Sequence, residues 1–314
     1  MAELRTRIYI DGYNFYYGCL RGTPFKWLDV PALFEKHILP TILYQPNQSL
    51  PPSKMRLTDA SALKYFTAKI IDSAARAEDS VSSQATYHNA LAKHCGNKIE
   101  IILGSYSKFK SNQFLVDESQ PNRLPRDCAK VQVWKLEEKQ SDVNIALQMY
   151  DDAISGDVDQ IILVTNDTDL APALQMIKDR KPNIVRGLVI PTRKHAKSGN
   201  VERLANRDLS DLADWTRTYI TDEELHSSQL PYTISGARRH SKKPKSWYRK
   251  PHHVEKMIEL SKLVKKTEGQ TLRWAHEQSE YLQNKRPIDL LETDEGAALV
   301  FKYIETYIAK HLST

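Results

Sequence analysis

The sequence predicts an α/β fold in which a parallel sheet is covered by helices on both faces and followed by a small all-α domain. Apolar segments of strand length alternate with segments of helical spacing over residues 6–207. The run at 161–164 is wholly apolar, which is typical of a central parallel strand buried on both faces. After about residue 222 strand-like segments cease and helical spacing takes over.

The elements of the first half are expected from their local patterns. Three strands are expected, at 6–11, 62–71 and 99–107. A polar helix is expected at 81–95. Residues 40–60 are rich in Pro, Ser and Gln and indicate a loop or insertion, and 108–136 indicate irregular structure with a hairpin that ends on strand-like alternation.

The second half of the sheet region is more regular. Residues 141–154 have an apolar stripe at helical spacing, and Ser141 with Asp142 suits a helix start. The elements expected after it are a strand at 161–165, a helix at 169–180, a strand at 185–190 and a short helix at 200–207.

The length of 314 residues favours more than one domain. We expect a sheet domain at 1–222, a basic linker at 223–253 and a helical domain at 254–314. No apolar run approaches the roughly 20 residues that span a membrane, and the charged N-terminus lacks an apolar signal core. The three cysteines form no C-x-x-C pair. We therefore expect a cytoplasmic protein without a membrane partner, a disulfide framework or a structural zinc site.

The charge distribution indicates one polyanion-binding segment. The net charge is +6, and residues 235–253 contain seven Lys and Arg side chains, two aromatic residues and no acid. Cations beside aromatic rings hold single-stranded nucleic acid without reading its sequence. An equally simple interpretation is a solvated linker that happens to be basic. The candidate binding residues here are Arg238, Arg239, Lys242, Lys243 and Lys245.

Carboxylates stand where neighbouring parallel strands would end. Asp11 closes the first strand, Asp167 and Asp169 follow the strand at 161–165, and Asp142 begins a helix. Carboxyl ends of adjacent parallel strands meet at one sheet edge, where ligands bind. Clustered carboxylates repel each other unless cations neutralise them, and Mg²⁺ or Mn²⁺ prefers such oxygen ligands. Such ions activate water for phosphodiester hydrolysis.

Each acid alone is more often structural, since Asp is common at helix caps. Their joint placement is what favours a metal site, in which Asn14 would orient a ligand or a phosphate. The acids Asp151, Asp152, Asp157 and Asp159 are expected to be solvated groups near a helix end.

Three segments resemble motifs of the NYN domains, a branch of the PIN-like nucleases. Residues 10–15, Ile-Asp-Gly-Tyr-Asn-Phe, resemble the opening signature of the family. Residues 138–146 resemble its K-x-x-D-V motif, and residues 164–170 resemble its S-[GN]-D-[ST]-D-[FL] motif. The three occur in the order of the family, and the resemblance covers roughly residues 5–220.

The resemblance implies a PIN-like fold and a metal-dependent ribonuclease acting on single-stranded or structured RNA. It implies Mg²⁺ or Mn²⁺ at Asp11, Asp142, Asp167 and Asp169, with Asn14, Lys139 and Asn144 in or beside the motifs. Gln148 departs from the pattern because many NYN proteins have a further Asp there, so the number of ions stays open. The alternative is a protein that binds RNA without cutting it. A phosphatase would need a nucleophile motif that we do not find.

The C-terminal region carries a second resemblance. Trp274, Pro287 and Gly296, with the intervening Ile-Asp-Leu-Leu and Thr-Asp-Glu segments, resemble the toxin-binding domain of Xre/MbcA/ParS antitoxins. It implies a toxin–antitoxin-like role, with a protein partner or self-association through residues 254–314. The alternative is a helical packing module without a toxin partner.

Overall fold

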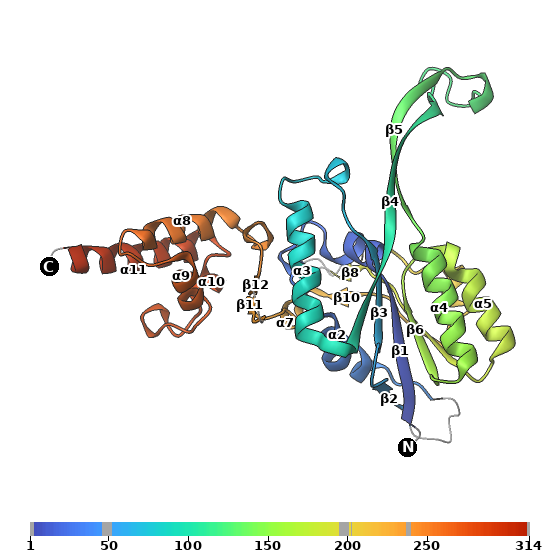
Figure 1. Cartoon of the computed structure of the whole chain (residues 1–314), viewed down its shortest axis with the longest axis horizontal. Helices are drawn as coiled ribbons and strands as arrows, with labels where there is room; N and C mark the ends of the chain where they lie inside the picture. The colour runs from blue at the N-terminus through green and yellow to red at the C-terminus, as the bar shows by residue number, and fades with distance from the viewer. Residues whose placement is uncertain (1–2, 46–51, 195–200, 202, 237–239, 313–314) are drawn as a thin grey trace.

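The computed structural model describes residues 3–45, 52–194, 201, 203–236 and 240–312. It has three parts, namely a helix-covered sheet, a long two-stranded arm formed by β4 and β5, and a helical C-terminal domain beside the sheet (Figure 1). The predicted α/β class with helices at the C-terminus is confirmed. No helix in the described parts of the chain is long and apolar enough to cross a membrane.

The main sheet has the strand order β5-β4-β3-β1-β6-β7-β9, and β2 pairs with the start of β1. All of these pairings are parallel except that between β4 and β5. Its strands are β1 (Glu3–Asp11), β2 (Lys54–Leu57), β3 (Leu63–Ala68), β4 (Ile99–Phe114), β5 (Lys130–Lys139), β6 (Gln160–Val164), β7 (Val185–Val189) and β9 (Trp215–Arg217). Because Ile10 is in register with Val164, β1 and β6 end side by side, as predicted.

Helices cover both faces because β1 presents apolar side chains in both directions. Ile8 and Ile10 pack into the core under α2 (Val30–Leu33) and α3 (Ser80–Cys95). Tyr9 packs into the other core, under α4 (Ser141–Ser155), α5 (Ala171–Arg180) and α6 (Arg207–Ser210). This period of two places a layer of helices on each side of the sheet. The short α1 (Gly12–Phe15) directly follows β1.

The hairpin expected within 108–136 is confirmed, since β4 continues to Phe114 and β5 returns from Lys130. One expected helix is placed wrongly. The short helix expected at 200–207 instead begins at Arg207, where the Asn206 side chain caps α6 by accepting from the Asp208 amide at 3.0 Å. Residues 200 and 202 lie outside the described residues. The expected loop at 40–60 contains β2, and its residues 46–51 lie outside the described residues.

Asp152 is not a solvated acid, contrary to expectation. It lies on the side of α4 that faces the sheet and is 8% exposed. The Tyr9 hydroxyl and the Lys64 ammonium donate to it at 2.6 and 2.7 Å, and the Arg7 guanidinium lies at 2.6 Å. A buried charge persists only when it is paired and hydrogen-bonded. This network ties α4 to β1 and β3.

The C-terminal domain has its own apolar core, in which Val254, Met257, Leu272, Ile288 and Val300 take part. Its helices are α8 (Pro251–Lys262), α9 (Glu268–Ala275), α10 (Pro287–Leu290) and α11 (Asp294–Leu312). The pair β8 (Arg193–Lys194) with β10 (Ile220–Thr221) belongs to the first domain. Between the domains lie α7 (Asp222–Ser227) and the pair β11 (Thr233–Ile234) with β12 (Ser241–Lys242).

Candidate functional site

Asp11 is the buried centre of the acidic site. Its carboxylate accepts from the Asn14 amide and from the Thr165 hydroxyl, each at 2.9 Å. The backbone after Asp11 lies close against β3, since a Cβ on Gly12 would stand 2.5 Å from the carbonyl oxygen of Phe66. Burial raises the pKa of Asp11 to about 6, against the two hydrogen bonds and with the help of Asp142 and Glu138. The surroundings of Asp11 therefore favour its protonated, uncharged form.

The loop after β6 presents two further acids. Asp167 caps a short 3₁₀ turn, Thr168–Leu170, by accepting from the Asp169 amide at 3.1 Å. The Asp167 amide donates to Thr165 Oγ1 at 3.1 Å. Thr165 thus links both strand ends, because the same hydroxyl donates to Asp11.

Asp142 completes the predicted acids, and Glu138 joins them. Burial raises the pKa of Asp142, with further contributions from Asp167 and Asp169. Burial also raises the pKa of Glu138 on β5, and Asp142 adds to it. These mutual effects show one negatively charged region beside the ends of β1 and β6. Sequence reasoning missed Glu138 as a site acid, although it opens the 138–146 motif segment.

The donors suit a hydrated hard cation. Among the described residues, no three of these acids bring ligand atoms within 4.8 Å of one another, so they do not form a closed cage. Mg²⁺ characteristically keeps several waters and takes only a few carboxylates. The Asn14 side-chain oxygen is buried and has no hydrogen-bond partner. An orphaned oxygen beside spread carboxylates fits Mg²⁺ or Mn²⁺ bound partly through water.

Lys139 and Asn144, two other residues in or beside the motifs, lie on different faces of their elements from Glu138 and Asp142. Lys139 donates to Glu137 at 2.6 Å. It lies opposite Ser105 in the ribbon, on the face away from Glu138. Asn144 follows Asp142 by two residues, which is about 200° around α4. Their roles in substrate binding stay predictions.

The described part of the basic segment makes mainly internal contacts. Lys243 is half-buried and donates to the Pro24 carbonyl at 3.2 Å, and Lys245 pairs with Glu268 at 3.2 Å. The Trp247 ring packs on Trp27 and Tyr87, with centroids 6.2 and 5.7 Å apart. Lys242 is exposed, whereas Arg238 and Arg239 lie outside the described residues. Lys243, Lys245 and Trp247 are thus engaged within the protein, and RNA binding by the five basic candidates stays a prediction.

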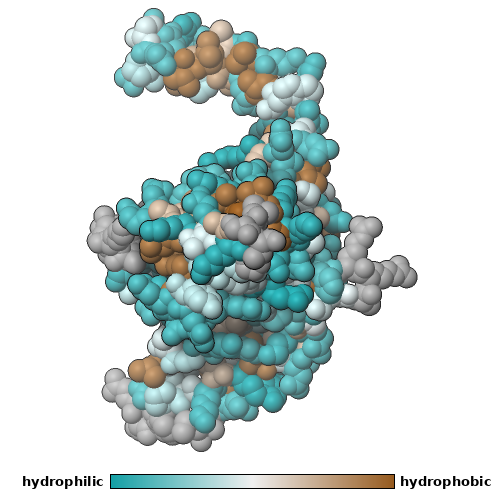
Figure 2. Space-filling view, turned by 90° about the vertical axis from the view of Figure 1, so that its left-hand side faces the viewer, coloured by the Kyte–Doolittle hydropathy of each residue, from teal (hydrophilic) through white to brown (hydrophobic). Residues whose placement is uncertain are grey.

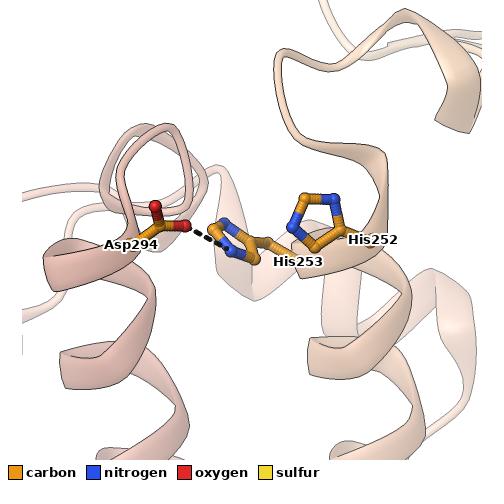
Figure 3. A group of neighbouring side chains, drawn as sticks. All are labelled: His252, His253 and Asp294. Carbon is orange, nitrogen blue, oxygen red and sulfur yellow. Dashed lines mark ion pairs between the residues drawn. The ribbon is translucent and has the colours of Figure 1, made fainter.

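One other side-chain trio has metal-ligand chemistry. His252, His253 and Asp294 have candidate ligand atoms within 4.8 Å of one another. Figure 3 shows the ion pair between Asp294 and His253, with His252 next to His253. However, the Lys250 ammonium lies 2.7 Å from the Asp294 oxygen that faces His253 at 3.2 Å. His253 Nδ1 contacts the Leu291 carbonyl at 2.8 Å. The carboxylate is already paired with a cation, so the trio serves to fasten α11 to α8.

The raised pKa of Asp11 gives a pH-dependent stability. In the window from about pH 4 to about pH 6 the folded state holds a proton on Asp11 that the unfolded chain has lost. Without divalent ions, the free energy of unfolding should therefore fall as pH rises through this window, by about 3 kcal/mol in all. Urea titrations in chelator at several pH values test this, with Asp11→Asn as control. An equal fall in Asp11→Asn would contradict the assignment.

The comparisons with known proteins agree with this geometry at the level of the domain. Residues 64–207 match the NYN domain model, a stretch that contains the second and third motifs but begins after the first. The first motif belongs to the same domain as the matched residues, since β1 with Asp11 lies between β3 and β6 in one sheet. Fold and site thus define a NYN domain, which belongs to a nuclease-like superfamily associated with nucleic-acid binding.

A curated relative matches nearly the whole chain. The 6-hydroxy-3-succinoylpyridine 3-monooxygenase HspA of Pseudomonas putida is 50% identical over 98% of this chain and 96% of its own. The chain belongs to the same family as this relative and contains a NYN domain. A crystal structure of a protein of unknown function from Vibrio parahaemolyticus aligns with a TM-score of 0.38 and 19% identity, over 70% of this chain and 94% of that one.

Proposed function

We propose that the chain is a divalent-metal-dependent ribonuclease that hydrolyses phosphodiesters of RNA. The observation that supports this proposal is that β1 and β6 end side by side, where the Thr165 hydroxyl links Asp11 to the loop that contains Asp167. The nuclease-like nature of NYN domains supports it.

The roles that we propose for the residues follow from their positions. Asp11, Asp142, Asp167 and Asp169 would hold Mg²⁺ or Mn²⁺, with Glu138 in reach of the same charge region. A bound ion supplies an activated water and stabilises charge on the phosphate oxygens. Thr165 and the Asn14 backbone amide fix the Asp11 carboxylate, and the Asn14 side-chain oxygen is buried without a partner. The protein therefore provides a rigid acid at its centre and more exposed acids at its rim.

The direct test is incubation of the purified chain with end-labelled single-stranded RNA. Cleavage should appear with Mn²⁺ or Mg²⁺, disappear in EDTA and return when the ion is restored in excess. Structured RNA in parallel reactions tells whether pairing protects the substrate. Intact RNA at all metal concentrations would contradict the proposal.

The relative supports a second candidate, hydroxylation of a substituted pyridine. The observation in its favour is 50% identity over nearly both chains. A pocket of about 470 Å³ between the domains is lined by Tyr232, Lys243, Tyr248 and Arg273 among others, so it offers rings and cations to an aromatic acid. Burial lowers the pKa of Lys243 to about 8. The sequence has no G-x-G-x-x-G dinucleotide fingerprint. Oxygen-dependent conversion of 6-hydroxy-3-succinoylpyridine, followed by mass spectrometry, tests this candidate.

We also propose that residues 254–314 mediate protein association, as the antitoxin resemblance implies. Trp274 is half-buried and stacks on Tyr303 with centroids 5.7 Å apart, whereas Tyr281 is 79% exposed and stacks on the same Tyr303 ring with centroids 5.6 Å apart. Exposed tyrosines are frequent among energetically dominant interface residues.

These two aromatic residues should respond differently to truncation. Trp274→Ala should lower the stability of the C-terminal domain by about 1–3 kcal/mol because it removes core packing. Tyr281→Ala should leave the unfolding curve unchanged but weaken association. Urea denaturation and sedimentation velocity on the full chain measure both effects. If the parent and Tyr281→Ala both sediment as the same monomer, the association role is contradicted. If Trp274→Ala unfolds at the same urea concentration as the parent, the core role of Trp274 is contradicted.

A further inference from the structure

The hairpin arm pairs only with itself. β4 leaves β3 at Gly104, and from Ser105 onwards it pairs with β5 alone, over ten residue pairs ending at Phe114 and Lys130. Ten strand residues extend about 30 Å. The arm stands off the rest of the molecule in Figure 1, and Figure 2 shows brown apolar side chains among the teal ones along it.

Residues opposite each other in an antiparallel ribbon share a face, so the register sorts the arm into two faces. We call one the Trp134 face. It consists of the pairs Tyr106/Glu138, Lys108/Leu136, Lys110/Trp134, Asn112/Gln132 and Phe114/Lys130. Beyond Glu138 this face has three lysines and no acid. The opposite face contains Phe109, Val131 and Val133, and its Lys135 and Lys139 both pair with Glu137.

The cations and rings of the Trp134 face are interleaved. The ammonium groups of Lys108 and Lys110 lie 4.6 and 5.4 Å from the centre of the Trp134 ring. That of Lys130 lies 4.8 Å from the Phe114 ring. Trp134 is 60% exposed and Phe114 44%. Exposed rings flanked by lysines hold single strands by base stacking and phosphate contact.

This face begins at the acidic site. Its first pair contains Glu138, which belongs to the acidic region, and Tyr106. Tyr13 lies two residues after Asp11, and its hydroxyl donates to the Tyr17 hydroxyl at 3.4 Å.

Tyrosines and arginines extend the surface on the domain side. The Tyr13 and Tyr17 rings lie 4.7 Å apart, and the Arg21 and Arg76 guanidinium groups lie 5.2 and 5.8 Å from the Tyr17 ring. Rings and cations therefore continue from the arm past the acids to α1.

We propose that the Trp134 face of the arm and this tyrosine cluster bind the single-stranded RNA that the acidic site cuts. The inference rests on the proposed ribonuclease function and adds where its substrate lies. Charge complementarity selects RNA as the occupant, since the lysines of this face oppose no carboxylate beyond Glu138. The opposite face, with Phe109, Val131 and Val133 and with its lysines paired to Glu137, would be the better surface for a second copy of the chain.

The test separates binding from cutting by using the full chain with Asp167→Asn and labelled single-stranded RNA in fluorescence anisotropy. Adding Trp134→Ala should weaken binding roughly tenfold. Adding Lys108→Gln, Lys110→Gln and Lys130→Gln should flatten the salt dependence, by about 0.7 in log–log slope for each phosphate that a lysine no longer neutralises. The matched controls are Phe109→Ala and Lys135→Gln on the opposite face, which should bind like the parent.

The outcomes distinguish this inference from the function beneath it. With Asp167 intact, the arm variants should cut an RNA too short to reach the arm at the parental rate, and a long RNA more slowly at low RNA concentration. Equal affinities of parent and arm variants would overturn the arm assignment alone. A parent that neither binds nor cuts RNA would overturn the ribonuclease proposal as well. Sedimentation as a dimer that Trp134→Ala dissociates would assign this face to a second copy and refute RNA as its occupant.

Discussion

Replacing Asp167 with Asn should lower the rate of metal-dependent RNA cleavage by about a thousandfold. The amide keeps the shape of the side chain, and its oxygen can still accept from the Asp169 amide, so the loop after β6 should keep its fold. The variant lacks a negative charge that would help hold the ion. Asp11→Asn should have a similar effect, since it removes the most buried carboxylate of the site. Initial rates at saturating Mn²⁺ measure both.

The matched control is Asp151→Asn, which removes an exposed acid from the same helix as Asp142. It should cut RNA at the parental rate. Asp11→Asn should also be more stable than the parent at pH 7 in chelator, because it no longer ionises a buried carboxyl group whose pKa is about 6. Cleavage that persists in both site variants, in preparations free of contaminating nuclease, would remove the acids from the mechanism.

Asp152→Ala should have the largest effect on stability. It would leave Arg7 and Lys64, with side chains only 13% and 11% exposed, without their shared carboxylate. Breaking a buried ion pair on one side costs about 3–5 kcal/mol, because the remaining charge is buried and uncompensated. The free energy of unfolding from urea titration measures this loss.

The comparison for Asp152 is Asp159→Ala. Asp159 pairs with Arg5 at 2.9 Å, where both side chains are more than a third exposed, so its removal should cost about 1 kcal/mol or less. A double variant, Asp152→Leu with Lys64→Met, should recover part of the loss because it removes both an acid and a base from the interior. Equal losses in Asp152→Ala and Asp159→Ala would mean that the network contributes no more than a surface pair.

The central sheet could be predicted because its strands are short apolar runs and its acids follow them directly. Ile161–Val164 and the register of Ile10 with Val164 are the clearest examples. The sequence also indicates a hairpin within 108–136, but the length of the arm could not be predicted, because β4 and β5 continue beyond the sheet with Lys, Ser and Gln in place of a buried face. Periodicity marks buried faces and does not report how far a solvated ribbon extends.

Single charged residues escaped prediction for a related reason. Asp152 and Asp151 are adjacent in sequence, yet only the position of α4 on the sheet decides that one is buried and the other exposed. Glu138 lies four residues before Asp142 in the 138–146 segment, but only the register of β5 decides on which face of the ribbon its side chain lies. The cations of residues 242–250 form a run in sequence, but domain packing engages most of them.

The most direct measurement of the central claim uses one preparation and two substrates. The purified chain and its Asp167→Asn variant are each incubated with labelled single-stranded RNA in Mn²⁺ and, separately, with 6-hydroxy-3-succinoylpyridine in air with a reductant. We predict that the parent cleaves RNA and that Asp167→Asn does not. RNA left intact by a preparation that hydroxylates the pyridine, at equal rates in parent and variant, would contradict the claim that the acidic site is the catalytic centre of a ribonuclease.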